Sequence, residues 1–262
     1  MACNGYISGL SKVFIVGHYA RSAVNAVTGR AVLLRSKDPN KDQTFYLSQI
    51  SQSSLERTLF PLWNYTKPEI RVLAKSLLPS HIAQKPDSQG LCFVEPSSGR
   101  HFSTFLKDYL PPPEPAEVVL ENGKVVGHHN SIWTVTVGER SRLSFKESQR
   151  LNPGGQWYVA EKQTQPPRYV IVPGKDHPRL FSRGLVARDW KWIDGEEDWT
   201  QKGMVAQIRH RQRPIKCSVE VSGEKVVVEF EGEEVYGVTP GQAVAVWLDE
   251  RCLGGGIIEN AY

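Results

Sequence analysis

Short apolar runs and one amphipathic pattern organise the first 94 residues of the chain. Residues 13–16 (VFIV) and 31–34 (AVLL) are β-branched or aliphatic runs, which favour short strands. Thr66 and Glu69 form a capping box in front of an apolar stripe, and Pro79 ends it, so the spacing predicts a helix over 66–77. The stripe consists of Ile70, Leu73, Ala74 and Leu77. Strands alternating with helices predict part of an open, mostly parallel sheet.

The pattern changes near residue 96. A proline-rich stretch at 111–115 cannot continue a helix and predicts an extended entry to a new domain. Short alternating runs separated by Gly-rich turns follow, as in WTVTV at 133–137. Three further strand-like runs predict a small antiparallel barrel or sandwich, at 217–221, 226–230 and 243–247.

These zones predict an α/β plus all-β fold in three domains. Residues 1–95 form an α/β domain, residues 96–183 a small central β domain, and residues 184–262 a C-terminal β-barrel or sandwich.

Composition narrows the class of protein without naming it. Of the 262 residues, 40% are hydrophobic and 23% charged, as in a globular chain, and no run approaches the roughly 18 apolar residues of a membrane helix. The net charge of +4 is too small to indicate a polyanionic partner by itself. The four cysteines lie far apart without metal-ligand spacing, which indicates reduced thiols and no zinc site.

Two polar segments stand where α/β proteins bind ligands. GHYAR at 17–21 follows a strand directly; Gly17 lets a ligand approach the backbone, and His18 is placed to meet phosphate or base, although a solvated strand end explains the segment equally well. Lys41, Asp42 and Gln43 precede a helix predicted to begin near Thr44. A helix N-terminus favours phosphate, but a plain capping turn is the favoured interpretation.

Cys92 is the most informative candidate for chemistry. The turn-forming run DSQG at 87–90 delivers this thiol at the start of an apolar stretch. A thiol beside a glycine turn is reachable, and a thiolate there acts as a nucleophile or carries sulfur. A small buried hydrophobe is the more common role for a lone cysteine beside phenylalanine.

Residues 208–216 form the densest basic stretch. In a strand, Arg209, Arg211 and Arg213 would share one face as a ladder for phosphates, whereas a solvated edge strand is the alternative. Near the C-terminus, TPGQAV at 239–244 reads as a turn into a strand. The glycines of CLGGGII at 252–258 lack the Lys-Ser/Thr of a phosphate loop, which favours structural use.

Taken in order, these motifs make the chain resemble the tRNA-specific 2-thiouridylases, which put sulfur on C2 of the wobble uridine, most of all their mitochondrial branch. The resemblance rests on ten segments: GHYAR at 17–21, KDQTFYL at 41–47, DSQGLCF at 87–93, GHH at 127–129, WTVTVGER at 133–140, QWYVAEK at 156–162, DHPRL at 176–180, IRHRQ at 208–212, TPGQAV at 239–244 and CLGGGII at 252–258.

The resemblance implies that residues 1–95 are a partial PP-loop nucleotide-binding and catalytic domain and that residues 184–262 are a tRNA-binding β-barrel. It also implies roles residue by residue. In this family ATP adenylates the C2 oxygen, and a cysteine persulfide then displaces AMP. Cys92 matches the persulfide-carrying cysteine, and Gly17 matches an ATP-contacting glycine. The matches to the family's tRNA contacts are His18, Lys41, Asp42, Gln43, Arg209, His210 and Gln242. The resemblance also brings the expectation of a disulfide bond.

The implied partners are tRNA and a sulfur-relay donor of the cysteine-desulfurase type, with no metal, DNA or membrane. The implied compartment is the mitochondrial matrix, or the cytoplasm for a bacterial source.

Two departures from the family pattern bear on activity. The SGGxDS phosphate loop of the PP-loop ATPase-like fold has no counterpart in these residues, so we expect adenylation by this chain alone to fail. The family's first catalytic cysteine lies in a Cys-Asn pair, which Cys3 and Asn4 match only superficially. Two rival hypotheses therefore stay open: a non-catalytic tRNA-binding chain, and an interaction protein without RNA affinity.

Overall fold

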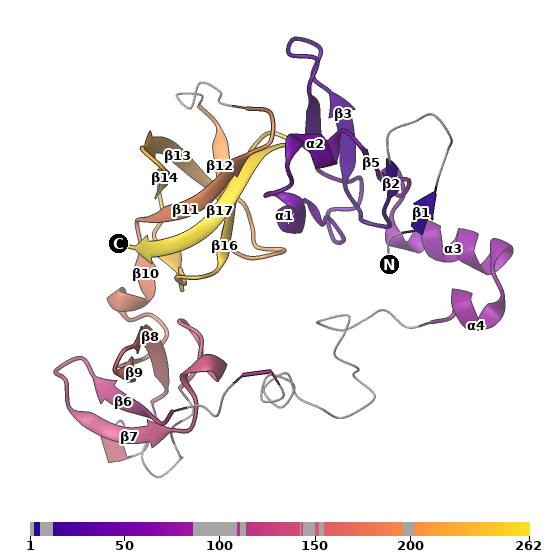
Figure 1. Cartoon of the computed structure of the whole chain (residues 1–262). Helices are drawn as coiled ribbons and strands as arrows, with labels where there is room; N and C mark the ends of the chain where they lie inside the picture. Colours follow the sequence, from indigo (N-terminus) through magenta and orange to yellow (C-terminus); the bar gives the residue numbers. More distant parts are fainter. Residues whose placement is uncertain are drawn as a thin grey trace. The chain divides into compact units, whose positions relative to one another are not determined.

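A computed structural model describes residues 3–5, 13–85, 109–110, 114–141, 143, 150–151, 155–195 and 202–262. The chain divides into two compact units. The first comprises Met1–Gln84, Arg183–Val235 and Pro240–Tyr262, and the second comprises Lys85–Ser182 and Tyr236–Thr239. Figure 1 shows the course of the chain through both. Because the predicted boundary at 95 lies outside the described residues, the three-domain division stays a prediction.

The first unit begins with short strands and helices. In chain order they are β1 (Cys3–Gly5), β2 (Val13–Ile15), β3 (Arg21–Val24), β4 (Ala31–Leu34), α1 (Thr44–Leu47), α2 (Gln52–Leu55), β5 (Thr58–Leu59), α3 (Lys67–Leu77) and α4 (Ser80–Ala83). β2 pairs in parallel with β5 and antiparallel with β1, in the order β1-β2-β5. The parallel pairing agrees with the expected α/β sheet.

The strand at 31–34 forms as predicted but joins a different sheet. β4 pairs antiparallel with β3 and, through Leu33 and Leu34, with the last strand of the chain, β17 (Arg251–Ala261). Ala31, Val32 and Leu33 are all buried, so both faces of this strand need covering. The apolar core that includes Leu33 also contains Trp247 and Cys252 from the C-terminal part of the chain.

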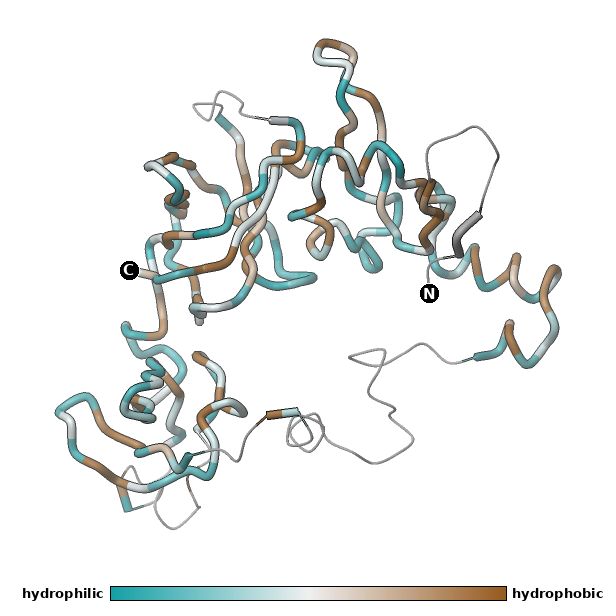
Figure 2. Tube along the Cα trace, in the orientation of Figure 1, coloured by the Kyte–Doolittle hydropathy of each residue, from teal (hydrophilic) through white to brown (hydrophobic). Residues whose placement is uncertain are grey.

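Helix α3 has the predicted bounds and cap. The Glu69 carboxylate accepts a hydrogen bond from the Thr66 backbone N–H at 2.6 Å, and Thr66 Oγ1 accepts one from the Glu69 N–H at 3.5 Å, which completes the capping box. Hydrophobic and hydrophilic residues alternate along this helix in Figure 2. Its predicted apolar stripe is only partly covered, however: Ile70 and Ala74 are half-buried, whereas Leu73 is 38% and Leu77 76% exposed.

Six antiparallel strands close the predicted C-terminal barrel. Its order is β11-β14-β13-β12-β16-β17, and β17 pairs back to β11 (Figure 1). Their bounds are β11 (Gly184–Trp192), β12 (Met204–Gln207), β13 (Ile215–Ser222), β14 (Lys225–Phe230) and β16 (Ala243–Leu248), with β17 as above. β15 (Val235–Tyr236) lies between β14 and β16 in the sequence. The predicted strands at 217–221, 226–230 and 243–247 all belong to this barrel.

The glycines of β17 have the structural use that was favoured. A Cβ on Gly254 would lie 2.2 Å from the Lys191 carbonyl oxygen, and one on Gly255 would lie 2.5 Å from Ser48 Oγ. Only a residue without a side chain lets β11 and the end of α1 pack this closely on the strand.

The second unit is built on a four-stranded sheet in the order β7-β6-β9-β8. Its elements are β6 (Ala116–Leu120), β7 (Val125–His129), the 3₁₀ helix η2 (Ile132–Thr134), β8 (Trp157–Thr164), β9 (Pro167–Pro173), the 3₁₀ helix η3 (Pro178–Leu180) and β10 (Phe181–Ser182). The strand predicted at 133–137 is wrong. Ser131 caps a 3₁₀ turn there by accepting the Trp133 N–H, so the alternating pattern reflects packing of Ile132 and Val135 into the core instead.

Candidate functional site: a polar pocket between two turns

Two turns distant in sequence line one pocket of about 370 Å³ in the first unit. One turn lies between β4 and α1, and the other connects β12 to β13. The lining residues are Arg35, Ser36, Pro39, Asn40, Asp42, Thr44, Phe45, Gln207, His210, Arg211, Gln212 and Pro214. Asp42 and His210, both predicted to contact RNA, are therefore brought to the same cavity.

The first turn is held by Asp42 and Gln43. Asp42 Oδ1 accepts hydrogen bonds from the Thr44 N–H at 2.9 Å and the Thr44 hydroxyl at 2.8 Å, which starts α1 where the sequence predicted it. Asp42 thus makes an Asx turn ahead of the helix, while the N-cap residue itself, Gln43, makes no side-chain capping bond. Gln43 exchanges two hydrogen bonds with Tyr19: its Oε1 accepts the Tyr19 N–H, and its own N–H donates to the Tyr19 carbonyl, both at 2.9 Å. The turn thereby lies against the segment that carries His18.

The second turn replaces the predicted arginine ladder, which is wrong. β12 ends at Gln207, and β13 begins only at Ile215. Between them the Ile208 N–H donates to Gln212 Oε1 at 3.0 Å, and Arg211 adopts the left-handed conformation with φ of 66°. A chain that reverses in this way cannot place alternate arginines on one face of a strand.

Arg35 joins the two turns. Its guanidinium donates to Asp42 Oδ2 at 3.1 Å and to Gln207 Oε1 at 3.1 Å, and its Cζ lies 4.3 Å from the centre of the Trp247 ring. Gln207 in turn donates from Nε2 to the Gln212 carbonyl. We call Arg35, Asp42, Gln207 and Trp247 the Arg35 junction.

His210 packs against an exposed aromatic ring. The centroids of the His210 and Tyr46 rings are 4.5 Å apart, and Tyr46 is 63% exposed. Burial and the neighbouring Arg211 charge lower the pKa of His210, and Asp42 offsets part of this effect. Its imidazole is therefore neutral near pH 7, which suits stacking and hydrogen bonding more than charge pairing.

The remaining predicted contacts lie near the pocket or at the same end of the barrel. Lys41 and Arg209 are chain neighbours of two lining residues. Gln242 is exposed just before β16, where the register places Gln207 opposite Ala245, so Gln242 stands at the barrel end that carries the second turn. His18 is half-buried, and burial lowers its pKa. Its Nδ1 has no hydrogen-bond partner among the described residues.

Gly17 leaves room where the resemblance implies ATP. Within the described residues, no atom other than those of Gly17 and its two chain neighbours lies within 4 Å of the position that a Cβ would take there. The glycine is thus not required by local packing, which fits a site where a ligand approaches the backbone. No cluster of three or more potential metal-ligating side chains occurs within the described part of the chain.

Two of the four cysteines have thiols that the structure describes. Cys217 and Cys252 are free and buried, and burial raises the pKa of each thiol to about 12. Both are therefore inert at neutral pH, and the expected disulfide has no support among the described residues. Cys92 lies outside those residues. The backbone of Cys3 pairs with that of Ile15, two residues before Gly17.

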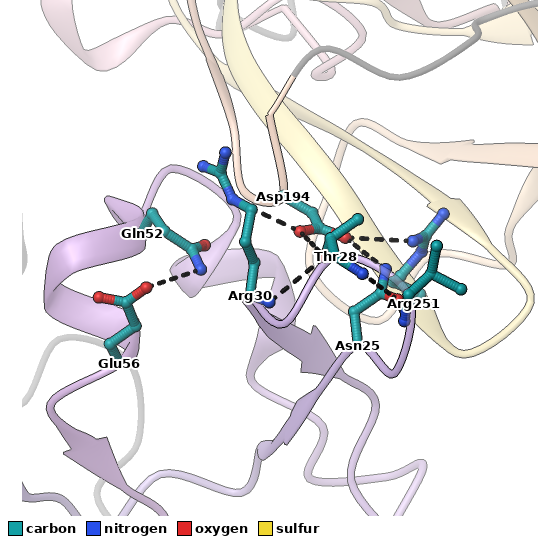
Figure 3. Close-up of polar contacts among 8 residues, drawn as sticks. Asn25, Thr28, Arg30, Gln52, Glu56, Asp194 and Arg251 are labelled. Atoms are coloured by element: carbon teal, nitrogen blue, oxygen red, sulfur yellow. Dashed lines mark hydrogen bonds and ion pairs between the residues drawn. The ribbon is translucent and has the colours of Figure 1, made fainter.

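A second polar cluster joins the turn between β3 and β4 to the end of β11 and the start of β17. Asp194, whose side chain is 5% exposed, accepts hydrogen bonds from Asn25 Nδ2 at 2.8 Å and Thr28 Oγ1 at 3.2 Å. Arg30 and Arg251 pair with it at 3.6 and 3.4 Å (Figure 3). We call these five residues the Asp194 cluster.

Sequence reasoning missed most of the pocket. Arg35 and Gln207 carried no motif signal, because an arginine after an apolar strand and a glutamine before a basic stretch are ordinary surface residues. Tyr46 lies inside the motif at 41–47, but its contact with His210 could not be read from the sequence. Their position becomes informative only when the two turns meet.

The fold and the pocket define a class: a chain with a small α/β segment, a four-stranded β unit and a closed six-stranded barrel beside a polar pocket. Three family models match in this order: the tRNA methyl transferase HUP domain over residues 7–96, the tRNA methyl transferase PRC-barrel domain over 103–173, and the aminomethyltransferase β-barrel domain over 182–258. The predicted fold class is thereby confirmed.

Comparison with curated proteins names the family. The chain is 38% identical over 245 residues to tRNA-specific 2-thiouridylase MnmA 1 of Geobacillus kaustophilus, covering 93% of this chain and 63% of that protein. It is 39% identical over 253 residues to the MnmA of Acinetobacter baumannii strain SDF, covering 93% and 65%, and 38% identical over 253 residues to that of Cupriavidus pinatubonensis, covering 96% and 67%. The chain belongs to the tRNA-specific 2-thiouridylase family, and it spans about two thirds of the length of these relatives.

Proposed function

We propose that this chain acts in the 2-thiolation of tRNA, as the sulfurtransferase that modifies C2 of the wobble uridine. The observation that carries the proposal is the pocket itself. Two turns, bridged by a hydrogen bond between residues 172 positions apart, were predicted separately to contact RNA, and they line one polar cavity in a chain of this family. A site that gathers arginine, amide and imidazole groups suits a nucleic-acid ligand.

The proposed roles follow the residues. Cys92 carries the persulfide; the buried state of Cys217 and Cys252 supports this assignment, because neither forms a thiolate at neutral pH. Gly17 lies against ATP, whose adenylation chemistry makes the uridine C2 oxygen a leaving group. The tRNA is held by His18, Lys41, Asp42, Gln43, Arg209, His210 and Gln242.

The proposed partners are tRNA and a sulfur donor of the cysteine-desulfurase type, which renews the persulfide after each turnover. The relatives named above are bacterial. The mitochondrial matrix and the bacterial cytoplasm are therefore the two compartments proposed, and the source of the gene separates them. Among the described residues, no helix has the length and apolar character needed to cross a bilayer.

The test is a thiolation assay on the chain supplied with tRNA, ATP and a persulfide donor, with 2-thiouridine measured by mass spectrometry of the digested RNA. We expect Cys92→Ser, placed in the full-length protein of this family if the chain alone is inactive, to abolish 2-thiouridine formation while leaving tRNA affinity within about twofold, since a thiol-to-hydroxyl change alters nucleophilicity and not charge. Cys217→Ser is the matched control. Undiminished thiolation by Cys92→Ser contradicts the assignment.

The same assay separates the two rival hypotheses. Binding that weakens steeply as salt rises, without any thiolation, identifies a tRNA-binding chain. Salt-insensitive behaviour without a tRNA complex identifies an interaction protein instead.

A further inference from the structure

We propose that Arg35 is the positioning residue of the RNA surface: it holds the turn at 41–43 and the turn at 208–212 at one fixed separation, without serving as a phosphate contact itself. This inference rests on the proposed tRNA function for its biological meaning. Its physical core, the coupling of the two turns, is independent of RNA.

The contacts of Arg35 indicate that it positions other residues and does not bind RNA directly. Its side chain is 24% exposed, and its guanidinium already donates to Asp42 and to Gln207 at 3.1 Å each. The Asp42 carboxylate beside it balances its charge. A cation so paired has little left to attract a phosphate, since opposite charges in contact cancel at longer range.

The geometry requires an arginine. The flat guanidinium lies over the Trp247 ring at 4.3 Å while two of its nitrogens reach acceptors from different elements. Stacking on an aromatic face leaves the in-plane donors available, which a lysine ammonium cannot reproduce. Trp247 is fully buried in the barrel wall, so the platform is rigid.

Each of the two acceptors, Asp42 and Gln207, makes a further hydrogen bond that fixes one of the turns. The other carboxylate oxygen of Asp42, Oδ1, accepts the Thr44 N–H at the start of α1. This bond fixes the turn in which Lys41 and Gln43 flank Asp42. Gln207 uses its amide nitrogen to hold the Gln212 carbonyl, which closes the turn containing Arg209 and His210. Loss of Arg35 therefore releases both groups of proposed RNA contacts at once.

The experiment compares tRNA affinity across salt for the wild-type chain and four variants. We expect Arg35→Lys and Arg35→Met to weaken binding about tenfold with an unchanged slope of log K against log salt, because the number of neutralised phosphates stays the same. Arg209→Ala is the contrast, since a direct phosphate contact lowers the slope by about 0.9. A slope that falls by this amount in the Arg35 variants overturns the proposal in favour of direct contact.

Arg251→Lys controls for stability alone. Arg251 has a similar exposure of 22% and also pairs with an acid, but it does so in the Asp194 cluster. We expect it to lower Tm and to leave affinity unchanged when binding is measured well below Tm. If Arg35→Lys behaves in the same way, Arg35 is merely structural and the proposal fails.

A measurement without RNA distinguishes a failure of the positioning role of Arg35 from a failure of the proposed tRNA function. Amide hydrogen exchange at Thr44 and Ile208, whose N–H groups report the two turns, should accelerate together in Arg35→Lys and in neither position in Arg251→Lys. If both amides accelerate and the wild-type chain binds no tRNA, the coupling stands and the proposed function fails. If only one amide or neither accelerates, the positioning role is refuted whatever the RNA result.

Discussion

The Arg35 junction and the Asp194 cluster both join the N-terminal part of the chain to the C-terminal barrel, and both contain an arginine–carboxylate pair. They differ in the polar groups that remain available to a ligand. In the Asp194 cluster a nearly buried carboxylate accepts from two neutral donors and two arginines (Figure 3). The Asp194 carboxylate itself is nearly sealed from solvent, and although 44% of the Arg30 side chain is exposed, none of the five residues lines the pocket. Such a cluster contributes to stability, and it lies outside the cavity where a ligand would be held.

At the Arg35 junction one cation supports two acceptors beside an open pocket. Arg211 and Asn40 line the same pocket and are exposed, and the proposed RNA contacts flank it. The comparison teaches that an arginine–carboxylate pair is not by itself a functional sign. What distinguishes the two sites is whether the pair lies beside a pocket lined by further polar groups.

The largest expected effect is a loss of stability in the Asp194 cluster. Asp194→Asn leaves Arg30 and Arg251 without their acid, and we expect the free energy of unfolding to fall by about 3 kcal/mol, since a nearly buried charge network loses its centre. Urea denaturation measures this loss, and tRNA affinity should be unchanged in the folded protein. Glu250→Gln, which removes the exposed partner of Arg21, is the control with an expected change within about 0.5 kcal/mol.

A loss of tRNA affinity in Asp194→Asn without a loss of stability would erase the distinction between the two sites.

The next largest effect concerns the pocket beside the Arg35 junction, where Arg211 has a strained backbone conformation. Arg211 holds φ of 66°, a conformation that glycine adopts freely. We expect Arg211→Gly to raise the free energy of unfolding by about 0.5 kcal/mol and yet to weaken tRNA binding about fivefold, because relief of strain comes with loss of a cation at the pocket. Denaturation and filter binding on the same samples measure both.

Asp249→Gly is the matched control for Arg211→Gly, since Asp249 has φ of 53° in the tight turn between β16 and β17. It should gain stability without losing affinity. A stable Arg211→Gly variant that binds tRNA as well as wild type would remove Arg211 from the RNA surface.

The smallest effect is a pH dependence. Because the pKa of folded His210 lies below its ordinary value of about 6.5, the unfolded chain takes up this proton first as pH falls. Stability is therefore unaffected by His210 above this value and declines as pH falls below it. We expect the wild type to lose more unfolding free energy between pH 7 and pH 5 than His210→Gln does, and equal losses would contradict a neutral, partly buried imidazole.

Sequence patterns predicted local structure well where local physics decides it. The capping box at Thr66, the start of α1 at Thr44 and the barrel strands follow from hydrogen bonds and alternation within a few residues. The same local reasoning was wrong at 133–137 and at 208–214, where alternating residues belong to a 3₁₀ turn and a tight loop. Alternation signals a strand only if a neighbouring strand is there to pair with it.

The amino-acid sequence by itself determined the family, the fold class and the candidate residues, because ordered motifs and short-range periodicity are properties of the chain alone. Only the tertiary structure decided which arginine–carboxylate pair faces a pocket, that Arg35 bridges two turns 172 residues apart through Gln207, and that Cys217 and Cys252 are sealed. The physical reason is that burial, charge compensation and hydrogen-bond partnership depend on which distant segments meet. Patterns within a few residues of the sequence do not show which distant segments come into contact.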